Sequence, residues 1–464
     1  AAVATAVRNA SEERAADGSC PLSPIQAEFL QRDLPRPQHW NQSILLGSDQ
    51  ALDERQVHSA LDKVTQCHDA LRLRFRRRTD GSWQQHYVAG GTSFELRVLL
   101  AEETLAQVGA ELNAGLSLEH GPLLRVALQT GAQPRLLLIA HHLIIDGVSW
   151  RILLDDLDRA LANPHGWQPD ARTASYRAWV ERLIGVAESR VLRGDFPYWM
   201  EQARLGPAHP VAGAVTGAAC ATQVLGGPLS EVLSSRLLQV GTGARIEEVL
   251  LTALVVALRQ ASGWSDVVLA SETHGRNLFD DLDVSRSLGW FTTQFAVRLR
   301  MPRDGDAASA LNAISGQLRR ARSLAASYGI LRTYDPDPEL RTSLAGQPAP
   351  ELAFTYFGRT QDAVEGGRLW RTEGESGAVR APENGSETAL EVSAVFIGQR
   401  LSVFWTVELS LLDPQYVARI QRAFPQALTD VLEAEDIQGL EPSFAPNSVL
   451  AAALSELIDN TTQD

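Results

Sequence analysis

The chain's clearest structural pattern is RLLLIAHHLIIDGVSWRILLDDL, at residues 135–157. It predicts a buried strand that runs into two histidines, a short loop and an amphipathic helix. His141 and His142 therefore lie at a strand end, where a rigid scaffold can present a side chain to a substrate. The ordinary pKa of histidine lies near neutral pH, which suits a general acid or base. Successive strand residues point to opposite faces, so at most one of the two should face a cleft.

A lone histidine more often has a structural role, as a core or surface residue satisfied by backbone hydrogen bonds. In this chain the pair is followed by Asp146 and Gly147. The glycine would permit a turn, and the aspartate can fix a loop through charge-assisted hydrogen bonds. This context favours a functional role for the pair.

The rest of the chain mixes strands and helices. Apolar or alternating runs predict strands at residues 43–47, 135–140, 266–271, 294–300 and 400–409. Helical spacing relates Val57, Leu61, Val64 and Leu71 in one segment and Leu311, Ile314 and Leu318 in another. Neither half alternates strictly between strand and helix, which favours an α+β fold with mostly antiparallel or mixed sheets.

Length and composition indicate two lobes of an ordinary globular protein. The chain has 464 residues, of which 44% are hydrophobic, and this exceeds the size at which one core stops growing. We expect a linker at 1–20, an N-terminal lobe at 21–205, an inter-lobe connection at 206–228, a C-terminal lobe at 229–445 and a tail at 446–464.

Charge and cysteine content exclude several classes of protein. The formal net charge of −14 opposes binding to nucleic acid or to anionic membranes. Three widely separated cysteines suggest neither a disulfide framework nor a zinc site, so a reducing cytoplasm is expected. The most apolar run, residues 249–258, is far shorter than the roughly 20 residues of a membrane span and predicts a core helix.

The segment HHLIIDGVSWRIL resembles the His-His-x-x-x-Asp-Gly motif of the condensation superfamily of non-ribosomal peptide synthetases. Its continuation VSWR, residues 148–151, resembles the epimerization branch. Similar blocks follow in the family's order: PLSPIQAEFL, HWNQSILL, SETHGRN, SRSLGWFTTQFAV, SYGILR and FTYFGR. The resemblance covers residues 21 to about 430. It implies two chloramphenicol-acetyltransferase-like lobes that form a V, with the active site in a tunnel between them.

Three positions depart from the family pattern. Thr273 stands where the family usually has glycine, Asn277 where it has glutamate, and Thr355 where the FTYFG block usually has asparagine. Glu272, His274, Gly275 and Arg276 are retained. The Thr355 change could alter the substrate polarity or the rate.

Epimerization needs one group to remove the α-proton of a thioester and another to return a proton to the opposite face. His142 and Glu272 fit these roles, because each follows an apolar strand in a different half of the chain. Enclosure in a cleft would raise the pKa of the Glu272 carboxyl towards a useful range. The alternative for Glu272 is an ordinary surface carboxylate.

Other candidate residues have supporting roles. We expect His141, Gly147, His274 and Arg276 to support the site rather than catalyse. The place of Asp146 in the family motif implies a structural ion pair, for which Arg276 is our choice of partner. Tyr356 could line the tunnel and hydrogen-bond near the reacting carbonyl, or could be an ordinary core tyrosine.

Three other chemistries are disfavoured. Ser149 lacks the second glycine of a nucleophile elbow. The stretch GTGARI at 241–246 lacks the third glycine of a dinucleotide-binding motif and follows a predicted helix. No spaced cluster of histidines and carboxylates implies a metal. A peptide-bond-forming condensation domain and an inactive relative that only docks carriers stay open as alternatives.

The resemblance also implies partners. The substrate would arrive on the 4'-phosphopantetheine arm of an upstream peptidyl carrier protein in the same polypeptide, and the domain itself would bind no cofactor. The tail segment SVLAAALSELID, Ser448–Asp459, sets apolar residues along one helical face. It predicts either a docking helix for a downstream condensation domain or a helix packed on its own domain. We expect a monomer.

Overall fold

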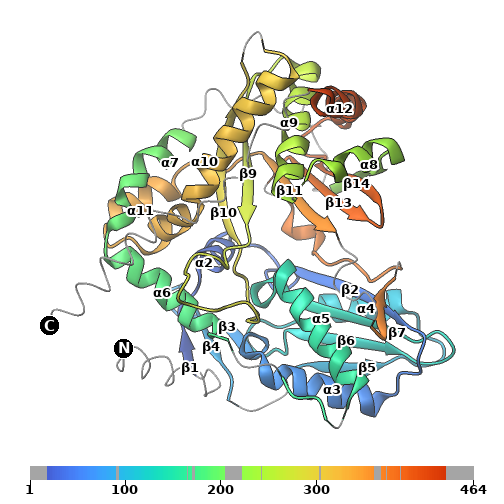
Figure 1. The fold of residues 1–464 in the computed structure, drawn as a ribbon. Helices are drawn as coiled ribbons and strands as arrows, with labels where there is room; N and C mark the ends of the chain where they lie inside the picture. Colours follow the sequence, from blue (N-terminus) through green and yellow to red (C-terminus); the bar gives the residue numbers. More distant parts are fainter. Residues whose placement is uncertain are drawn as a thin grey trace. The chain divides into compact units, whose positions relative to one another are not determined.

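A computed structural model gives the fold of the chain in two compact units (Figure 1). It describes residues 18–89, 93–164, 166–169, 173–203, 222–241, 243–302, 305–359, 367–372, 374–386 and 388–434. The first unit comprises Ala1–Gly185, Phe279–Thr292 and Gln361–Asn384. The second unit comprises Val186–Leu278, Thr293–Thr360 and Gly385–Asp464. Two segments from the second half of the sequence therefore belong to the first unit.

The first unit is built on a five-stranded sheet with the strand order β12-β2-β7-β6-β5. Its strands are β12 (Leu369–Arg371), β2 (Asn41–Ser48), β7 (Arg135–His141), β6 (Leu124–Gln129) and β5 (Glu95–Val98). Only β5 and β6 pair in parallel, and the other neighbours are antiparallel. A smaller antiparallel sheet has the order β1 (Gly18–Cys20), β4 (Trp83–Tyr87) and β3 (Leu73–Arg77).

Helices cover this sheet because its central strand is apolar on both faces. Every residue of β7 after Arg135 is buried. Helix α4 (Leu105–Ala114) packs its apolar side chains on Leu45, Ala127, Leu137 and Ile139 of three strands. Helix α3 (Glu54–Cys67) packs against α5 (Gly147–Ala162). The remaining helices are α2 (Pro24–Gln31), which starts with a Ser23–Gln26 capping box, and α6 (Tyr176–Glu188), which continues into the second unit.

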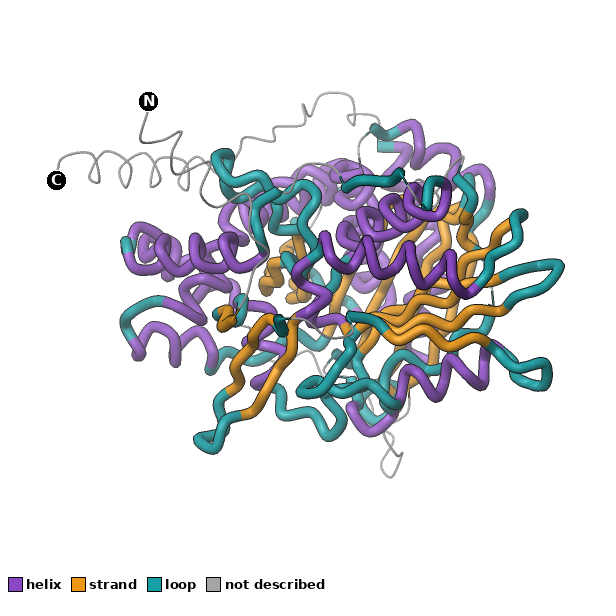
Figure 2. Tube along the Cα trace, turned by 90° about the horizontal axis from the view of Figure 1, so that it is seen from below, coloured by secondary structure: helices purple, strands orange, loops and turns teal. Residues whose placement is uncertain are grey.

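The second unit contains a mixed six-stranded sheet in the order β10-β9-β11-β13-β14-β8. The strands are β10 (Thr293–Arg300), β9 (Asp266–Thr273), β11 (Leu352–Arg359), β13 (Leu390–Ile397), β14 (Arg400–Glu408) and β8 (Thr222–Pro228). Strand β11 is parallel to both of its neighbours, β9 and β13. The α+β organisation with mixed sheets, which the sequence predicts, is thus confirmed, with helices packed against sheets in each unit (Figure 2).

The long apolar helix of the second unit, α9 (Gly243–Ser262), contacts α12 (Pro414–Glu433) and α10 (Ala307–Tyr334). The run at residues 249–258 lies within α9 and is a core helix, as predicted. Shorter helices are α7 (Phe196–Ala203), α8 (Glu231–Gln239) and α11 (Pro338–Ala345). Among the helices that the described ranges contain, each is too short or too polar to cross a bilayer.

Two details differ from the sequence prediction. Helix α3 ends at Cys67, and Leu71 lies in the following 3-10 turn, Asp69–Arg72, rather than in the helix. Within the expected connection at 206–228, residues Thr222–Pro228 form strand β8, which pairs with β14. Glycine at 226 is needed there, because a Cβ would lie 2.2 Å from the Val403 carbonyl oxygen. The predicted docking segment, Ser448–Asp459, lies outside the described residues.

Candidate active site

The histidine loop forms where β7 ends. His141 is the last residue of the strand, a 3-10 turn covers His142–Ile144, and Asp146 is the N-cap of α5. The backbone N–H of His141 donates to the Leu123 carbonyl at 3.0 Å, and that of His142 donates to the Trp40 carbonyl at 3.0 Å. The strand, turn and helix are those that the sequence predicts.

The side chain of His141 stabilises the histidine loop through hydrogen bonds to backbone atoms. This side chain is fully buried, and its Nε2 bonds the Pro37 carbonyl oxygen at 2.8 Å. Its Nδ1 accepts the Leu143 backbone N–H at 3.1 Å, so Nε2 carries the proton. Burial lowers the pKa of His141 to about 3. With both ring nitrogens bonded to backbone, His141 is a structural residue.

His142 is half-buried and is bonded at both ring nitrogens. Its Nδ1 lies 2.9 Å from the Ile145 carbonyl oxygen, and its Nε2 lies 2.8 Å from the side-chain nitrogen of Gln42. The ring stacks on Trp290 with centroids 4.1 Å apart. Burial lowers the pKa of His142 to about 4, against backbone hydrogen bonds that act to raise it. At neutral pH the imidazole is therefore uncharged and able to accept a proton.

Asp146 ties the histidine loop to the segment Phe279–Thr292, which comes from the second half of the chain. One carboxylate oxygen accepts the Ser149 N–H at 2.7 Å and the other accepts the Phe291 N–H at 3.1 Å. The Ser149 hydroxyl donates to the Gly289 carbonyl at 2.9 Å and accepts the Gly289 N–H at 3.1 Å. The serine hydroxyl therefore serves the scaffold.

Gly147 does not provide the turn that the sequence suggested. It is the first residue of α5, it is exposed, and it does not have a positive φ. Gly289 is the glycine that this region requires. Its φ is +155°, and a Cβ there would lie 2.4 Å from the Tyr176 ring.

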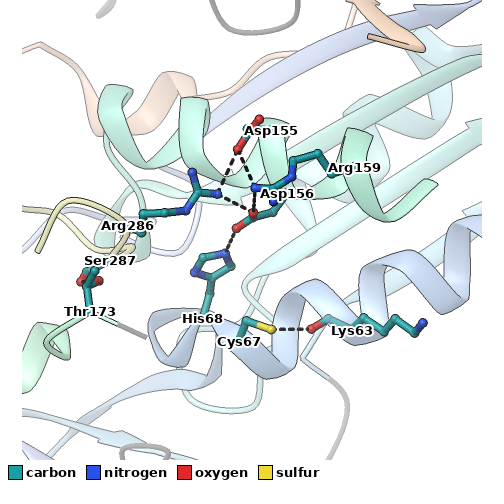
Figure 3. A network of polar contacts seen from close by, with 9 residues as sticks. All are labelled: Lys63, Cys67, His68, Asp155, Asp156, Arg159, Thr173, Arg286 and Ser287. Carbon is teal, nitrogen blue, oxygen red and sulfur yellow. Dashed lines mark hydrogen bonds and ion pairs between the residues drawn. The ribbon is translucent and has the colours of Figure 1, made fainter. Parts of the chain in front are cut away.

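A polar cluster anchors the same segment a few residues earlier in the chain (Figure 3). Arg286 forms ion pairs with Asp156, which is 2% exposed, and with Asp155 at 3.0 Å. The other oxygen of Asp156 lies 2.8 Å from His68 Nε2. The hydroxyls of Thr173 and Ser287 are 2.8 Å apart. Trp290 is thus held against His142 by anchors at Arg286, Gly289 and Phe291.

The second unit carries the other candidate residues at the end of β9. Glu272 is half-buried and pairs across the strands with Gln294 of β10. The chain then turns at Gly275, whose φ is +63°, and the Arg276 N–H donates to Nδ1 of the exposed His274 at 3.2 Å. His274 and Arg276 thus belong to the turn that directly follows the end of β9, where Glu272 lies.

Tyr356 and Thr355 lie near the end of β11, the parallel neighbour of β9. Leu352 of β11 pairs with Leu269 of β9. Thr355 and Glu272 each lie three residues after this pair along their own strands. Tyr356 is half-buried, and burial raises its pKa to about 12. Its hydroxyl stays protonated at neutral pH and can donate a hydrogen bond. Both strands therefore end at the same edge of the sheet.

The structure brings together His141, His142, Asp146 and Gly147 in the first unit, and Glu272, His274, Arg276 and Tyr356 in the second. The facing of His142 and Glu272, and the pair of Asp146 with Arg276, join residues of different units and stay predictions. Sequence reasoning assigned no role to Gln42, Trp150 or Trp290, although all three lie within the blocks that resemble the family. The available signal for Gln42 was a polar residue two positions before the apolar run at 44–46.

Comparison with known proteins gives the class of this fold. The epimerization domain from the third module of tyrocidine synthetase B aligns with a TM-score of 0.83 and 27% identity, over 92% of this chain and 99% of that domain. The fold is therefore the mixed α+β condensation-domain fold, whose structures have two chloramphenicol-acetyltransferase-like lobes. The fold prediction is confirmed in this respect.

The family follows from the sequence comparisons. The model of the Condensation domain matches residues 16–436, so the chain belongs to the Condensation domain family. A linear gramicidin synthase of Brevibacillus parabrevis is 31% identical over 97% of this chain. Chondramide synthase cmdD of Chondromyces crocatus is 33% identical over 90% of it. The chain spans only 9% and 11% of the lengths of these two relatives.

Proposed function

We propose that the chain is an epimerization domain, which inverts the α-carbon of an aminoacyl or peptidyl thioester on a carrier protein in non-ribosomal peptide synthesis. The observation that carries the proposal is the state of His142, an uncharged imidazole fixed by hydrogen bonds at the end of β7. The likeness to the tyrocidine synthetase epimerization domain supports it. So does membership of a family found in large peptide synthases.

The chemistry needs two proton transfers and no redox step. One group removes the α-proton, the electron pair of the C–H bond passes into an enolate-like thioester, and a second group returns a proton to the opposite face. We assign these two transfers to His142 and Glu272. The Tyr356 phenol, protonated at neutral pH, is our candidate donor towards the developing oxyanion.

The proposal includes the partners and the place of action. The carrier supplies the substrate on its 4'-phosphopantetheine arm, within the same polypeptide and in the cytoplasm. The domain needs no bound cofactor or metal for proton transfer and acts as a monomer. The residues 446–464 would contact a downstream condensation domain.

The test follows solvent deuterium into the substrate. With an L-aminoacyl carrier in deuterated water, the intact domain should place deuterium at the α-carbon and yield both D and L thioesters. His142→Gln and Glu272→Gln should each lower net inversion by about 10²–10⁴-fold. One variant should still exchange the α-proton of the L substrate, and the other that of the D substrate.

Exposed residues of the same types provide matched controls. His120→Gln and Glu351→Gln change residues that lie on the surface and should invert at the normal rate. A Glu272→Gln variant that inverts normally would remove Glu272 from the mechanism. Dipeptide formation from two loaded carriers, without inversion, would replace the proposal with a condensation activity.

A further inference from the structure

The side chain of Gln42 lies between the indole of Trp150 and the imidazole of His142. The Trp150 Nε1–H donates to the Gln42 Oε1 at 2.7 Å, and the Gln42 Nε2 lies 2.8 Å from the His142 Nε2. Trp150 is 5% exposed and Gln42 is half-buried, so water competes little for these bonds. All three residues belong to the first unit.

Trp150 fixes which way the amide of Gln42 points. An indole nitrogen can only donate a hydrogen bond, so the atom that it meets must be the amide oxygen. The amide nitrogen, which can only donate, is then turned to His142. Antiparallel pairing of β2 with β7, where Gln42 lies opposite Ala140, holds Gln42 beside the end of β7.

This orientation selects one protonation state of His142. Because Gln42 donates to Nε2, Nε2 must be unprotonated and accept, and Nδ1 must carry the proton that is donated to the Ile145 carbonyl. A proton on Nε2 would set two N–H donors against each other at 2.8 Å. Charged His142 is disfavoured by the same contact.

We infer that Gln42, oriented by Trp150, is a positioning residue that holds His142 as the Nδ1–H tautomer with Nε2 as its proton-accepting atom. The inference rests on the proposed function only in giving Nε2 a task in catalysis. The hydrogen bond from Gln42 must break before Nε2 can take the substrate α-proton. Between turnovers the same hydrogen bond keeps Nε2 of His142 unprotonated. The tautomer itself can be measured without any substrate.

Nitrogen-15 NMR of histidine-labelled domain tests the inference, with His142 assigned by comparison with His142→Gln. In the intact domain at pH 7.5, Nδ1 of His142 should have the chemical shift of a protonated nitrogen and Nε2 that of an unprotonated one. Gln42→Glu keeps the shape but turns an acceptor towards Nε2. It should raise the pKa of His142 by about 1 unit or more. Gln56→Glu adds the same charge at an exposed site of α3 and should leave the titration unchanged.

A protonated Nε2 in the intact domain, or an unchanged titration in Gln42→Glu, would overturn the inference. If Gln42→Glu does not fold, Trp150→Phe supplies the second test, because it removes the donor that orients the amide. The amide can then rotate, and a fraction of the Nε2–H tautomer should appear. A domain that shows the expected tautomer but does not epimerize would leave the inference standing and reject the proposed function.

Discussion

The ends of β7 and β9 carry the same sequence pattern but are supported in different ways. In each, an apolar strand delivers a titratable side chain, RLLLIA before His141–His142 and DVVLAS before Glu272. At β7 the loop is tied by Gln42, Asp146 and a segment that returns from residue 279 onwards. At β9 the chain turns at once through a loop whose next side chain, His274, is exposed.

The difference teaches where function and stability are coupled. Groups desolvated inside the first unit owe their altered pKa values to the packing of that unit. A change there should therefore affect folding as well as catalysis. At the end of β9, Glu272 is half-buried and His274 is exposed, so changes there should affect folding less than changes at the end of β7.

The largest expected effect is acid destabilisation through the histidine loop. Burial lowers the pKa of His141 to about 3 and of His142 to about 4, whereas the ordinary value is 6.5. Below pH 6.5 the unfolded chain binds protons that the folded chain excludes, so stability falls as pH falls. Each histidine costs up to about 1.4 kcal/mol per pH unit. Urea unfolding should show a loss of about 4 kcal/mol between about pH 6.5 and pH 4.5.

Variants at the ends of β7 and β9 test which residues cause this pH dependence of stability. His141→Asn should lose about half of the slope, because only His142 then contributes. Glu272→Gln should leave the contribution of the two histidines unchanged. A stability that does not change over this pH range would show that the loop is not desolvated in this way.

A smaller loss is expected for Asp146→Ala. The change removes the N-cap of α5, at about 1 kcal/mol, and leaves the buried Phe291 N–H without its acceptor, at about 1–3 kcal/mol. The free energy of unfolding should fall by about 3 kcal/mol. Glu272→Gln should cost less than about 1 kcal/mol. Equal losses of unfolding free energy in Asp146→Ala and Glu272→Gln would contradict the expected difference between the ends of β7 and β9.

A double-mutant cycle extends this measurement to the predicted pair of Asp146 and Arg276. If the two side chains pair, Asp146→Ala and Arg276→Gln should show an interaction energy of about 0.5–3 kcal/mol. Additive losses would reject the pair and leave Asp146 as a helix cap and loop anchor.

The smallest effect is expected at Thr355, which stands where the family usually has asparagine. Thr355→Asn should lower stability by less than about 0.5 kcal/mol, because asparagine suits a half-buried strand less well than threonine. One added hydrogen bond to the reacting groups, worth about 1 kcal/mol, would raise the inversion rate about fivefold. Thermal unfolding and the deuterium exchange assay measure the two quantities, and a rate change above about 100-fold would place residue 355 in the chemistry itself.

Local patterns predicted much of the fold. The strand and helix around His142 and the core helix at 249–258 follow from periodicity, which depends on neighbouring residues only. The end of α3 was missed, because Leu71 continues the helical spacing after the helix has ended at Cys67. Strand β8 was missed because its glycines interrupt the alternation that a strand pattern needs.

The support of the site could not be predicted, because it depends on residues far apart in the chain. Gln42 and His142 are 100 positions apart, and their contact follows from the pairing of β2 with β7. The distance from Asp146 to Phe291 in sequence is 145 positions. A single sequence indicates which residues are titratable, but not which distant side chain occupies each hydrogen-bonding atom.

The interleaving of the two units has a consequence for how the protein is made and recombined. The segment 279–292, which carries Trp290, is synthesised after residues 186–278 of the second unit, and strand β12 is synthesised after residues 293–360 of that unit. In an emerging chain, the edge of β2 and the surface around His142 therefore stay uncovered until these later segments have been synthesised. An exchange between relatives that moves residues 1–185 alone would join one protein's histidine loop to another's Trp290. Working chimaeras should therefore carry 279–292 and 361–384 together with 1–185.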